Sequence, residues 1–440
     1  MKKLLHLATL LVAVALFAAA CGTGAAPSPT ASPVATVPPS AAPSPTPEAT
    51  PNASPEPSPT IVPLFSKEGT LTIWVDGGRV KIMQALGEQF TAKYGVPVVV
   101  QELGFGDVRD QLKIAGPANE GPDIIIGAHD WLGELVSNGL LAPLNLGAKA
   151  KSFDPVGLKA LSYDGKLYGL PYLTEAIALY YNKDLVPNPP KTWKELKAIA
   201  QKLQDDKKVE QGYVLQQADP YHSYPIFSGF GGYIFGRDAS GSYDATDLGL
   251  DSPGGIAAAK EIESMIKSGL LRADVNYEVM MTLFKEGKSA MFMTGPWALN
   301  DVRAAKVNYG VAKIPKMTEA ARPFVGVQGF MVSAFGKNQL LAETFLTEYI
   351  ATDETMQALY DAVPNAPAWL PLRAKVTDKD IAVFAQSAAD GDPMPAIPQM
   401  SSVWEAWSKA ITLIYQQQQP AEQAIKDAAE TIRQQIAASQ

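Results

Sequence analysis

The sequence has little of the chemistry on which most enzymes depend. Its 440 residues include one cysteine and three histidines, and one of these histidines, His6, lies near the amino terminus. A single cysteine cannot form an intrachain disulfide. The sequence contains no GxSxG, HExxH, CxxC or phosphate-binding loop motif. We therefore predict no catalytic residue, no metal site and no cofactor.

Blocks of basic residues are also missing. The chain has 37 Lys and Arg against 45 Asp and Glu, which gives a formal net charge of −8. Nucleic acids and anionic lipid surfaces select proteins with clustered positive charge. The composition therefore predicts no nucleic-acid partner, whereas a neutral ligand such as a carbohydrate makes no demand on net charge.

The amino-terminal residues have the pattern of an export signal. Two lysines precede the apolar run Leu4–Ala20, which is short for a membrane-spanning helix, and Cys21 follows it directly. We expect residues 1–20 to be a signal peptide and the protein to be exported to the cell envelope. Cys21 is positioned to carry a lipid anchor on the outer face of the cytoplasmic membrane. Ala18 stands where lipoprotein signals usually have Leu, so an unanchored, periplasmic protein is the alternative.

Composition and periodicity divide the rest of the chain. Residues 21–66 are rich in Pro, Ser, Thr and Ala, which predicts an extended tether. The remainder is too long for one hydrophobic core, so we expect two domains. Strand-like runs alternate with helical ones, which predicts an α/β fold. The predicted strands are Leu71–Val75, Val96–Val100, Ile124–Ile126 and Ala178–Tyr181, and the predicted helices are Lys81–Tyr94, Thr192–Leu203, Gly255–Ser268 and Pro420–Ile436.

Local patterns add two details. Thr192 with Glu195 three residues later is typical of a capping box, so this segment is structural. Gly77 and Gly78 lack the further glycine spacing of a phosphate loop, and we expect a turn there after the first strand.

The segment GPDIIIGAHDWLGELVSNGLLAPL, residues 121–144, is the most informative one. Its apolar run predicts a buried parallel strand, and open α/β sheets bind ligands at the ends of such strands. Asp130 and Trp131 follow, a carboxylate beside an indole, which suits a sugar because one bonds hydroxyls and the other stacks on a pyranose ring. The alternative is that His129 and Asp130 only cap the next helix.

This segment resembles the maltose- and maltodextrin-binding proteins of bacterial ABC importers. The resemblance continues, in the order of that family, through PYLTEAIALYYNKDLVPNPPKTWKEL (171–196), ADPYHSYP (218–225), GPWALND (295–301), KVNYGV (306–311), PFVGVQGF (323–330) and MPAIPQMSSVWEAW (394–407). It implies a two-lobed periplasmic-binding-protein-like fold, with a ligand cleft between the lobes and a hinge of crossing segments. The implied first lobe is 67–174 with 331–374, and the second is 175–330 with 375–440.

The resemblance also implies a function and a site. The protein is expected to be a monomer that captures maltose or maltodextrin oligosaccharides and delivers them to the membrane subunits of an ABC importer. Matching the family motifs residue by residue implies nine ligand-binding residues: Asp76, Arg79, Asp130, Trp131, Glu175, Asp219, Tyr221, Trp297 and Trp404. Trp404 and Trp407 lie three apart on one predicted helix, and the family motif favours Trp404 as the stacking residue.

Other readings of the sequence remain open. The chain has Gly78, Gly127, Trp131, Glu405 and Ser408 where the best-known maltose-binding protein has an acid, a tryptophan, an arginine, a tyrosine and an arginine. The preferred sugar therefore does not follow, and cyclodextrin, trehalose and sucrose are alternatives. From another class, a glycoside hydrolase could use Asp130 and Glu175 as its two carboxyl groups.

Overall fold

The computed structural model describes residues 69–239 and 241–438. The predicted signal peptide, Cys21 and the whole predicted tether lie outside the described residues. Among those described, no helix is both long enough and apolar enough to cross a membrane.

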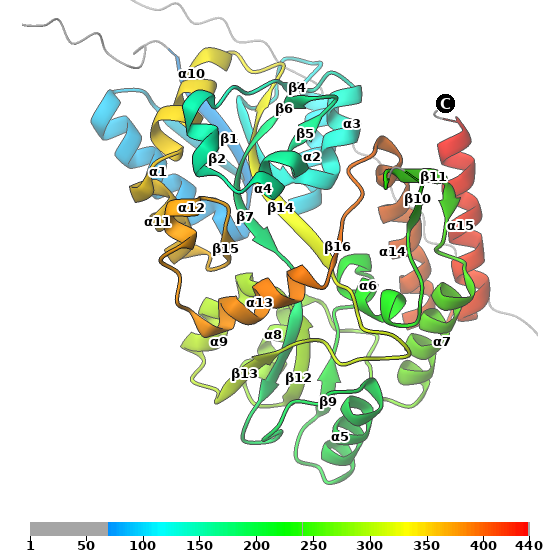
Figure 1. The fold of residues 1–440 in the computed structure, drawn as a ribbon. Coiled ribbons are helices and arrows are strands. Elements are labelled where there is room, and N and C mark those ends of the chain that lie inside the picture. Colours follow the sequence, from blue (N-terminus) through cyan, green and yellow to red (C-terminus); the bar gives the residue numbers. More distant parts are fainter. Residues whose placement is uncertain (1–68, 240, 439–440) are drawn as a thin grey trace, which may run out of the picture. The chain divides into compact units, whose positions relative to one another are not determined.

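The larger sheet contains the predicted first three strands (Figure 1). Its order is β15 (Ala366–Pro367), β7 (Gly169–Glu175), β14 (Phe324–Ser333), β3 (Ile124–Ala128), β1 (Leu71–Asp76) and β2 (Val98–Leu103), and the short strands β16 (Asp392–Pro393) and β4 (Leu141–Ala142) pair with β14. Strand β1 is parallel to both β2 and β3, with Ile73 beside Ile124. Strand β14 is antiparallel to β3 and β7. Strands β1, β3 and β7 therefore all run in the same direction.

The second sheet has the order β13 (Tyr309–Ala312), β8 (Ala178–Asn182), β12 (Ser289–Thr294) and β9 (Gln211–Val214). The chain passes from the first sheet to the second directly between β7 and β8, and it returns with β14. The predicted lobe boundary at residue 330 falls inside β14, whose pairing with β7 begins at Gly326. Two hairpins complete the strands, β5 (Ser162–Tyr163) with β6 (Lys166–Leu167) and β10 (Phe235–Arg237) with β11 (Tyr243–Leu248).

Helices surround both sheets in Figure 1, with α1, α2 and α10 around the first and α5, α8 and α13 around the second. The helices are α1 (Gly77–Tyr94), α2 (Phe105–Ala115), α3 (Leu132–Ser137), α4 (Pro155–Ala160), α5 (Trp193–Asp205), α6 (Pro220–Gly229), α7 (Pro253–Lys267), α8 (Tyr277–Lys285), α9 (Leu299–Ala304), α10 (Gln339–Thr344), α11 (Asp353–Ala362), α12 (Leu370–Arg373), α13 (Lys379–Ala389), α14 (Ser401–Tyr415) and α15 (Ala421–Ala438). Short turns of 3-10 helix are η1 (His129–Trp131), η2 (Gly147–Ser152), η3 (Pro296–Ala298) and η5 (Pro398–Met400), and η4 (Phe345–Ile350) is a π-helix.

The central strands are apolar on both faces because both faces are covered. Ile73 and Val75 of β1 belong to one hydrophobic cluster, whereas Trp74 between them belongs to another. In β3, Ile124 and Ile125 divide in the same way. This alternation follows from the two-residue period of a strand, and it explains why these strands read as continuous apolar runs.

Most predicted elements are present with shifted ends. The predicted strand at Val96–Val100 begins two residues later, at Val98. The capping box at Thr192 is confirmed, with Glu195 N–H donating to the Thr192 hydroxyl and the Glu195 carboxylate accepting from the Thr192 N–H. Helix α15 is amphipathic as predicted, with Ile425, Ile432 and Ile436 buried. The α/β class with two separate sheets is confirmed and is consistent with the two-lobed architecture.

The predicted turn at Gly77 and Gly78 is wrong. Both residues belong to the first turn of α1, and Asp76 is the N-cap, accepting a hydrogen bond from Gly78 N–H at 2.9 Å. A glycine in the first turn of a helix costs less than one in its interior, and the Asp76 cap stabilises the start. The strand therefore passes directly into the helix without a turn.

Candidate functional site

Three predicted acidic site residues lie at one edge of the first sheet. Asp76 ends β1, Glu175 ends β7, and Asp130 follows β3 by two residues. Because these strands run in the same direction, their carboxyl ends meet at the same edge, where α/β sheets place their ligands. We call Asp76, Arg79 and Glu175 the polar group.

Arg79 is the centre of the polar group. Its side chain is 11% exposed, and it donates through Nη1 to Asp76 and through Nε to the hydroxyl of Tyr172. Burial alone would lower the pKa of Arg79, but the neighbouring Tyr172, Asp76 and Glu175 raise it above its usual value. Arg79 is therefore a permanently charged donor whose position is set by partners on two strands.

Glu175 is buried beside this cation. Its Oε1 accepts a hydrogen bond of 2.8 Å from Gln328 Nε2 on β14. Burial raises the pKa of Glu175, and the charge of Arg79 and the bond from Gln328 oppose that effect. The Oε1 atom thus has a protein donor, and Gln328 Oε1 is a buried acceptor without a partner among the described residues. A ligand hydroxyl is the kind of donor that such an acceptor lacks.

His129 has a structural role that sequence could not separate from capping. The Val327 N–H donates to His129 Nδ1 at 3.1 Å, and Nε2 lies 3.2 Å from the carbonyl oxygen of Met394. One neutral tautomer, with the proton on Nε2, satisfies both contacts. Burial lowers the pKa of His129 to about 4, so the ring stays neutral near pH 7. No side-chain cap is formed at η1 or α3, so the capping interpretation of His129 and Asp130 is wrong.

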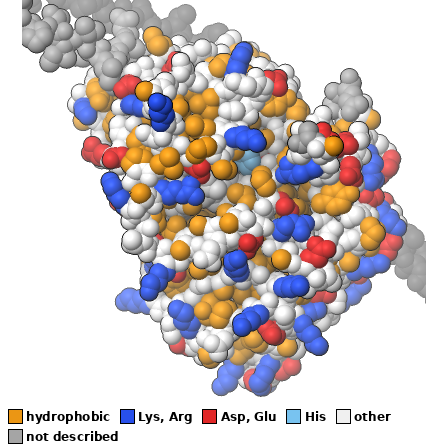
Figure 2. All heavy atoms as spheres, viewed as in Figure 1, with side chains coloured by type: hydrophobic (Ala, Val, Ile, Leu, Met, Phe, Trp, Pro, Cys, Tyr) orange, Lys and Arg blue, Asp and Glu red, His pale blue; other side chains and the backbone are white. Residues whose placement is uncertain are grey.

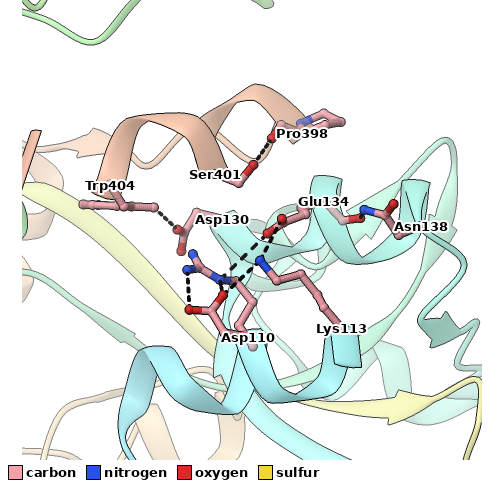
Figure 3. A network of polar contacts seen from close by, with 9 residues as sticks. Asp110, Lys113, Asp130, Glu134, Asn138, Pro398, Ser401 and Trp404 are labelled. Atoms are coloured by element: carbon pink, nitrogen blue, oxygen red, sulfur yellow. Dashed lines mark hydrogen bonds and ion pairs between the residues drawn. The ribbon is translucent and has the colours of Figure 1, made fainter. Parts of the chain in front are cut away.

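Asp130 points toward Trp404 on helix α14, as Figure 3 shows. The indole Nε1 donates to Asp130 Oδ2 at 3.1 Å. Burial raises the pKa of Asp130 to about 6, although the charge of Arg109 and the bond from Trp404 lower it. Asp130 Oδ1 is buried and without a hydrogen-bond partner among the described residues. Asp130 therefore offers an unused acceptor next to an aromatic ring.

Figure 3 also shows a charged network next to Asp130. Lys113 on α2 lies 3.0 Å from Asp110 and 3.1 Å from Glu134 on α3. Arg109 lies 2.9 Å from Asp110 and 3.8 Å from Glu134. These pairs join α2 to α3, the two helices that flank the Asp130 segment.

Both carboxylate oxygens of Asp219 have hydrogen-bond partners within the protein. It is the N-cap of α6, where Oδ1 accepts from the N–H groups of Tyr221 and His222. Its Oδ2 lies 2.8 Å from His222 Nδ1 and accepts from Gln216 Nε2 at 2.9 Å. Burial alone would raise the pKa of Asp219, but these partners lower it. The contacts give Asp219 a structural role that the sequence prediction did not include.

Tyr221, Trp297 and Trp404 form an aromatic group near Phe324. Each of the three is partly buried, and the rings of Tyr221 and Trp297 lie 6.2 Å apart. The ring of Phe324 at the start of β14 lies 6.1 Å from Tyr221 and 5.8 Å from Trp404. Burial raises the pKa of Tyr221, and the nearby charges of Glu175, Asp219 and Asp130 raise it further.

Trp407 is fully buried, one turn along α14 from the partly buried Trp404. Its ring packs on Phe227 at 4.9 Å. The structure therefore places Trp407 in the core and leaves Trp404 at the site.

Trp131 differs from its prediction as an exposed sugar platform. The side chain is only 4% exposed, and its ring lies over Gly127, where a Cβ atom would overlap the six-membered ring. The indole also packs against Phe105 at 4.8 Å. Trp131 is buried because the strand preceding it presents a glycine, which leaves room for the ring to fold back on its own backbone.

Several contributors were missed by sequence reasoning. Tyr172, Phe105, Gln328 and Phe324 all contact predicted site residues. Tyr172 lies on β7 three residues before Glu175, and Gln328 lies within PFVGVQGF, so both are in segments that the resemblance had selected. Phe105 carried no such signal.

Neither of two hollows in the described structure is lined by one of the nine predicted site residues. One of about 530 Å³ is lined by residues that include Pro190, Ile314 and Lys313. The other, of about 270 Å³, is lined by Tyr224, Phe324 and Asp392 among others. In the part of the chain that the structure describes, no cluster of three His, Cys, Asp or Glu side chains could hold a metal ion. The candidate site is therefore defined by the contacts of its side chains.

Comparison with known proteins places the chain in a family. The model of the bacterial extracellular solute-binding proteins matches residues 85–388. The chain belongs to this family. By their family description, members are extracellular binding proteins. The fold with two sheets, in which β1, β3 and β7 run in the same direction and end at the site, is consistent with that class.

Similar proteins bind oligosaccharides according to their names. The chain is 32% identical to the galactooligosaccharide-binding protein of Bacillus subtilis (strain 168) over 390 residues, which cover 85% of this chain and 91% of the relative. It is 30% identical to the maltodextrin-binding protein MdxE of the same organism over 347 residues, 76% of this chain and 82% of the relative. It is 29% identical to a maltooligosaccharide ABC transporter solute-binding lipoprotein of Streptococcus pneumoniae (strain ATCC BAA-255 / R6), with 83% and 88% covered.

Proposed function

We propose that this protein captures maltodextrin-type oligosaccharides outside the cytoplasmic membrane and delivers them to the membrane subunits of an ABC importer. Family membership supports a binding protein, and relatives named for maltodextrin and maltooligosaccharide binding support the sugar. The proposed ligand lies between a first lobe of 67–174 with 331–374 and a second of 175–330 with 375–440.

One observation carries the proposal. Buried acceptors with unused lone pairs, Asp130 Oδ1 and Gln328 Oε1, lie in the same site as three partly buried aromatic side chains. A pyranose needs both kinds of group, because its hydroxyls donate to acceptors and its apolar face covers a ring. Hydrogen bonds to charged acceptors are stronger than neutral ones, so Asp130 and Glu175 would contribute much of the specificity.

The proposed roles of the predicted residues follow from these contacts. Asp130, Glu175 and Arg79 would bond sugar hydroxyls, and Tyr221, Trp297 and Trp404 would stack on pyranose rings. Asp76 would hold Arg79, and Asp219 would hold the backbone from which Tyr221 projects. Trp131, which is buried, would contribute by packing against Phe105 and not by contacting the sugar.

The expected affinity suits transport. A disaccharide has about 23 non-hydrogen atoms, and at roughly 0.3 kcal/mol per atom its binding is worth about 7 kcal/mol, a Kd on the order of 10 μM. That affinity allows capture and release. Calorimetric titration with maltose, maltotriose, a cyclodextrin, trehalose and sucrose tests the proposal, and failure to bind any of them would contradict it.

A second sugar class is favoured by a specific observation. The relative with 32% identity is named for galactooligosaccharide binding. Galactose and glucose differ in the direction of one hydroxyl, and a site distinguishes them by where its hydrogen-bond donors and acceptors lie. The titration panel therefore includes a β-galactotriose. If the galactotriose bound and the malto-oligosaccharides did not, the sugar assignment would change and the transport role would stand.

We further propose that the protein does not hydrolyse its ligand. Burial raises the pKa of both Asp130 and Glu175, a property that the acid of a glycoside hydrolase also needs. The test is to follow reducing ends over a day in a mixture of the protein and a maltodextrin. Turnover that disappears in Asp130→Asn or Glu175→Gln would establish the enzyme instead.

The anchor and the assembly are proposals as well. Cys21→Ser is expected to release the protein from the membrane fraction without changing its affinity for sugar. Equal retention of wild type and variant would exclude the lipid anchor. We propose that the protein acts as a monomer, which light scattering with and without sugar would test.

A further inference from the structure

Phe105 is an aromatic side chain that the fold leaves exposed. Its side chain is 38% exposed, and the other exposed large apolar side chains among the described residues are aliphatic: Val99, Ile114, Val156, Leu340 and Leu370. A single exposed apolar side chain is normal at a protein surface, so a role for Phe105 as a contact residue depends on its neighbours.

The position of Phe105 places it beside the polar group. Phe105 is the first residue of α2, which follows the carboxyl end of β2. Strand β2 pairs in parallel with β1, and Leu103 lies opposite Asp76. The guanidinium carbon of Arg79 lies 5.8 Å from the centre of the Phe105 ring. The exposed ring and the charged hydrogen-bond donor of the site are therefore neighbours.

The ring of Phe105 is also supported from behind. Trp131 packs against it with 4.8 Å between the ring centres and 49° between the planes. Trp131 itself is held because its indole lies on Gly127. An aromatic side chain held by a buried neighbour loses little entropy when a ligand covers it, so it makes a good stacking surface.

We propose that Phe105 is a sugar-stacking residue. Its ring covers the apolar face of one pyranose while Arg79 and Asp130 bond the hydroxyls at the edge of the oligosaccharide. The stacking role that the sequence analysis predicted for Trp131 belongs to Phe105, and Trp131 packs behind it. This inference rests on the proposed function, since it names one further contact for the same class of ligand.

The test uses three variants of the mature protein and the malto-oligosaccharide that wild type binds most tightly. Phe105→Ala is expected to lower the affinity by about threefold to tenfold, the usual value of one stacked ring. Phe105→Trp retains a ring and should bind within about twofold of wild type. Ile114→Ala is the matched control, because Ile114 is an exposed apolar residue at the other end of the same helix. It should bind as wild type does.

The outcomes separate this inference from the proposed function. Wild type that binds no sugar in the panel overturns both. Wild type that binds, with Phe105→Ala and Ile114→Ala both unchanged, overturns the stacking role alone. Normal sugar binding by Phe105→Ala together with lost uptake in cells would assign Phe105 to the importer interface and also overturn it. Melting curves of all three variants ensure that a loss of affinity is measured on folded protein.

Discussion

The polar group and the aromatic group differ in how their side chains are bonded and exposed. In the polar group, Glu175 is buried, and the side chains of Arg79 and Asp76 are only 11% and 13% exposed. Arg79 pairs with Asp76 and donates to Tyr172, whereas Glu175 accepts from Gln328. In the aromatic group, Tyr221, Trp297 and Trp404 keep part of their surface free. The first group is ordered before a ligand arrives, because buried charges must be paired. The second group contributes apolar surface for the ligand, and such surface needs no specific hydrogen-bond partner.

The two groups also differ in what their loss should do. Removing a charge from the polar group leaves its partners buried and unpaired, so stability and binding fall together. Removing a partly exposed ring takes away ligand contact and little else. Outside the site, the charged side chains on the face in Figure 2 are of both signs and are interspersed with apolar ones.

The largest effect is expected from Arg79→Met. The change leaves Asp76 and Glu175 without their cation, and breaking a buried pair from one side costs about 3–5 kcal/mol. We expect that loss of unfolding free energy in a urea titration, together with loss of sugar binding. The control is Arg433→Met, which removes an exposed pair with Asp251 at 2.6 Å and should cost about 0–1 kcal/mol. Equal stability of the two variants would show that the polar group does not behave as a buried ion pair.

A second prediction concerns pH. The pKa of Asp130 in the folded state is raised to about 6. Between about pH 4 and 6 the folded state therefore binds more protons than the unfolded state, and stability falls as the pH rises. The pKa of His129 in the folded state is lowered to about 4. Between about pH 4 and 6.5 the unfolded state therefore binds more protons than the folded state, and stability increases as the pH rises. Each contribution is on the order of 3 kcal/mol, and the two oppose each other.

Single variants should separate these contributions. Asp130→Asn is expected to make stability rise more steeply with pH than in wild type, because the opposing Asp130 contribution is removed. His129→Gln is expected to change the slope in the opposite direction, because the His129 contribution is removed. Urea titrations at several values between pH 4 and 7 measure both slopes. Parallel curves for wild type and both variants would contradict the assignment.

The aromatic group should respond in binding alone. Tyr221→Ala and Trp297→Ala are each expected to weaken sugar binding by more than about tenfold, with the fold intact, because each removes both a stacked ring and the apolar area that it buries against the ligand. Calorimetry and melting curves measure the two properties side by side. Trp407→Ala is the contrasting variant, because this fully buried ring should cost about 3–5 kcal/mol of stability. A large fall in melting temperature without lost affinity in Trp297→Ala would mark that residue as structural.

The smallest effect concerns ligand length. Gly78, Trp131 and Ser408 replace groups that would bond one terminal disaccharide, and the Ser408 hydroxyl instead donates to the carbonyl oxygen of Ala218 at 2.6 Å. A neutral hydrogen bond is worth about 0.5–1.5 kcal/mol, and another stacked ring returns a similar amount to a longer ligand. We expect maltotriose or a cyclic dextrin to bind at least as tightly as maltose. A clear preference for maltose in parallel titrations would contradict this.

Local pattern was enough to predict much of the fold. The α/β class followed from apolar runs alternating with helical periods, and the start of α5 followed from Thr192 and Glu195 because a capping box involves only neighbours in the chain. The core face of α15 followed from the spacing of its isoleucines. Resemblance added the sugar class and the candidate residues, which composition could not supply.

Tertiary structure alone decided which of these residues face the site. Trp404 and Trp407 are alike in sequence, and only tertiary packing buries Trp407, whose ring lies against Phe227 of α6. The tautomer of His129 depends on Val327 and Met394, which are 198 and 265 residues away. The ring of Trp131 is buried and that of Phe105 exposed because of Gly127 and the position of α2. Sequence determines the chemistry that each side chain can supply, whereas exposure and pairing depend on contacts between segments far apart in the chain.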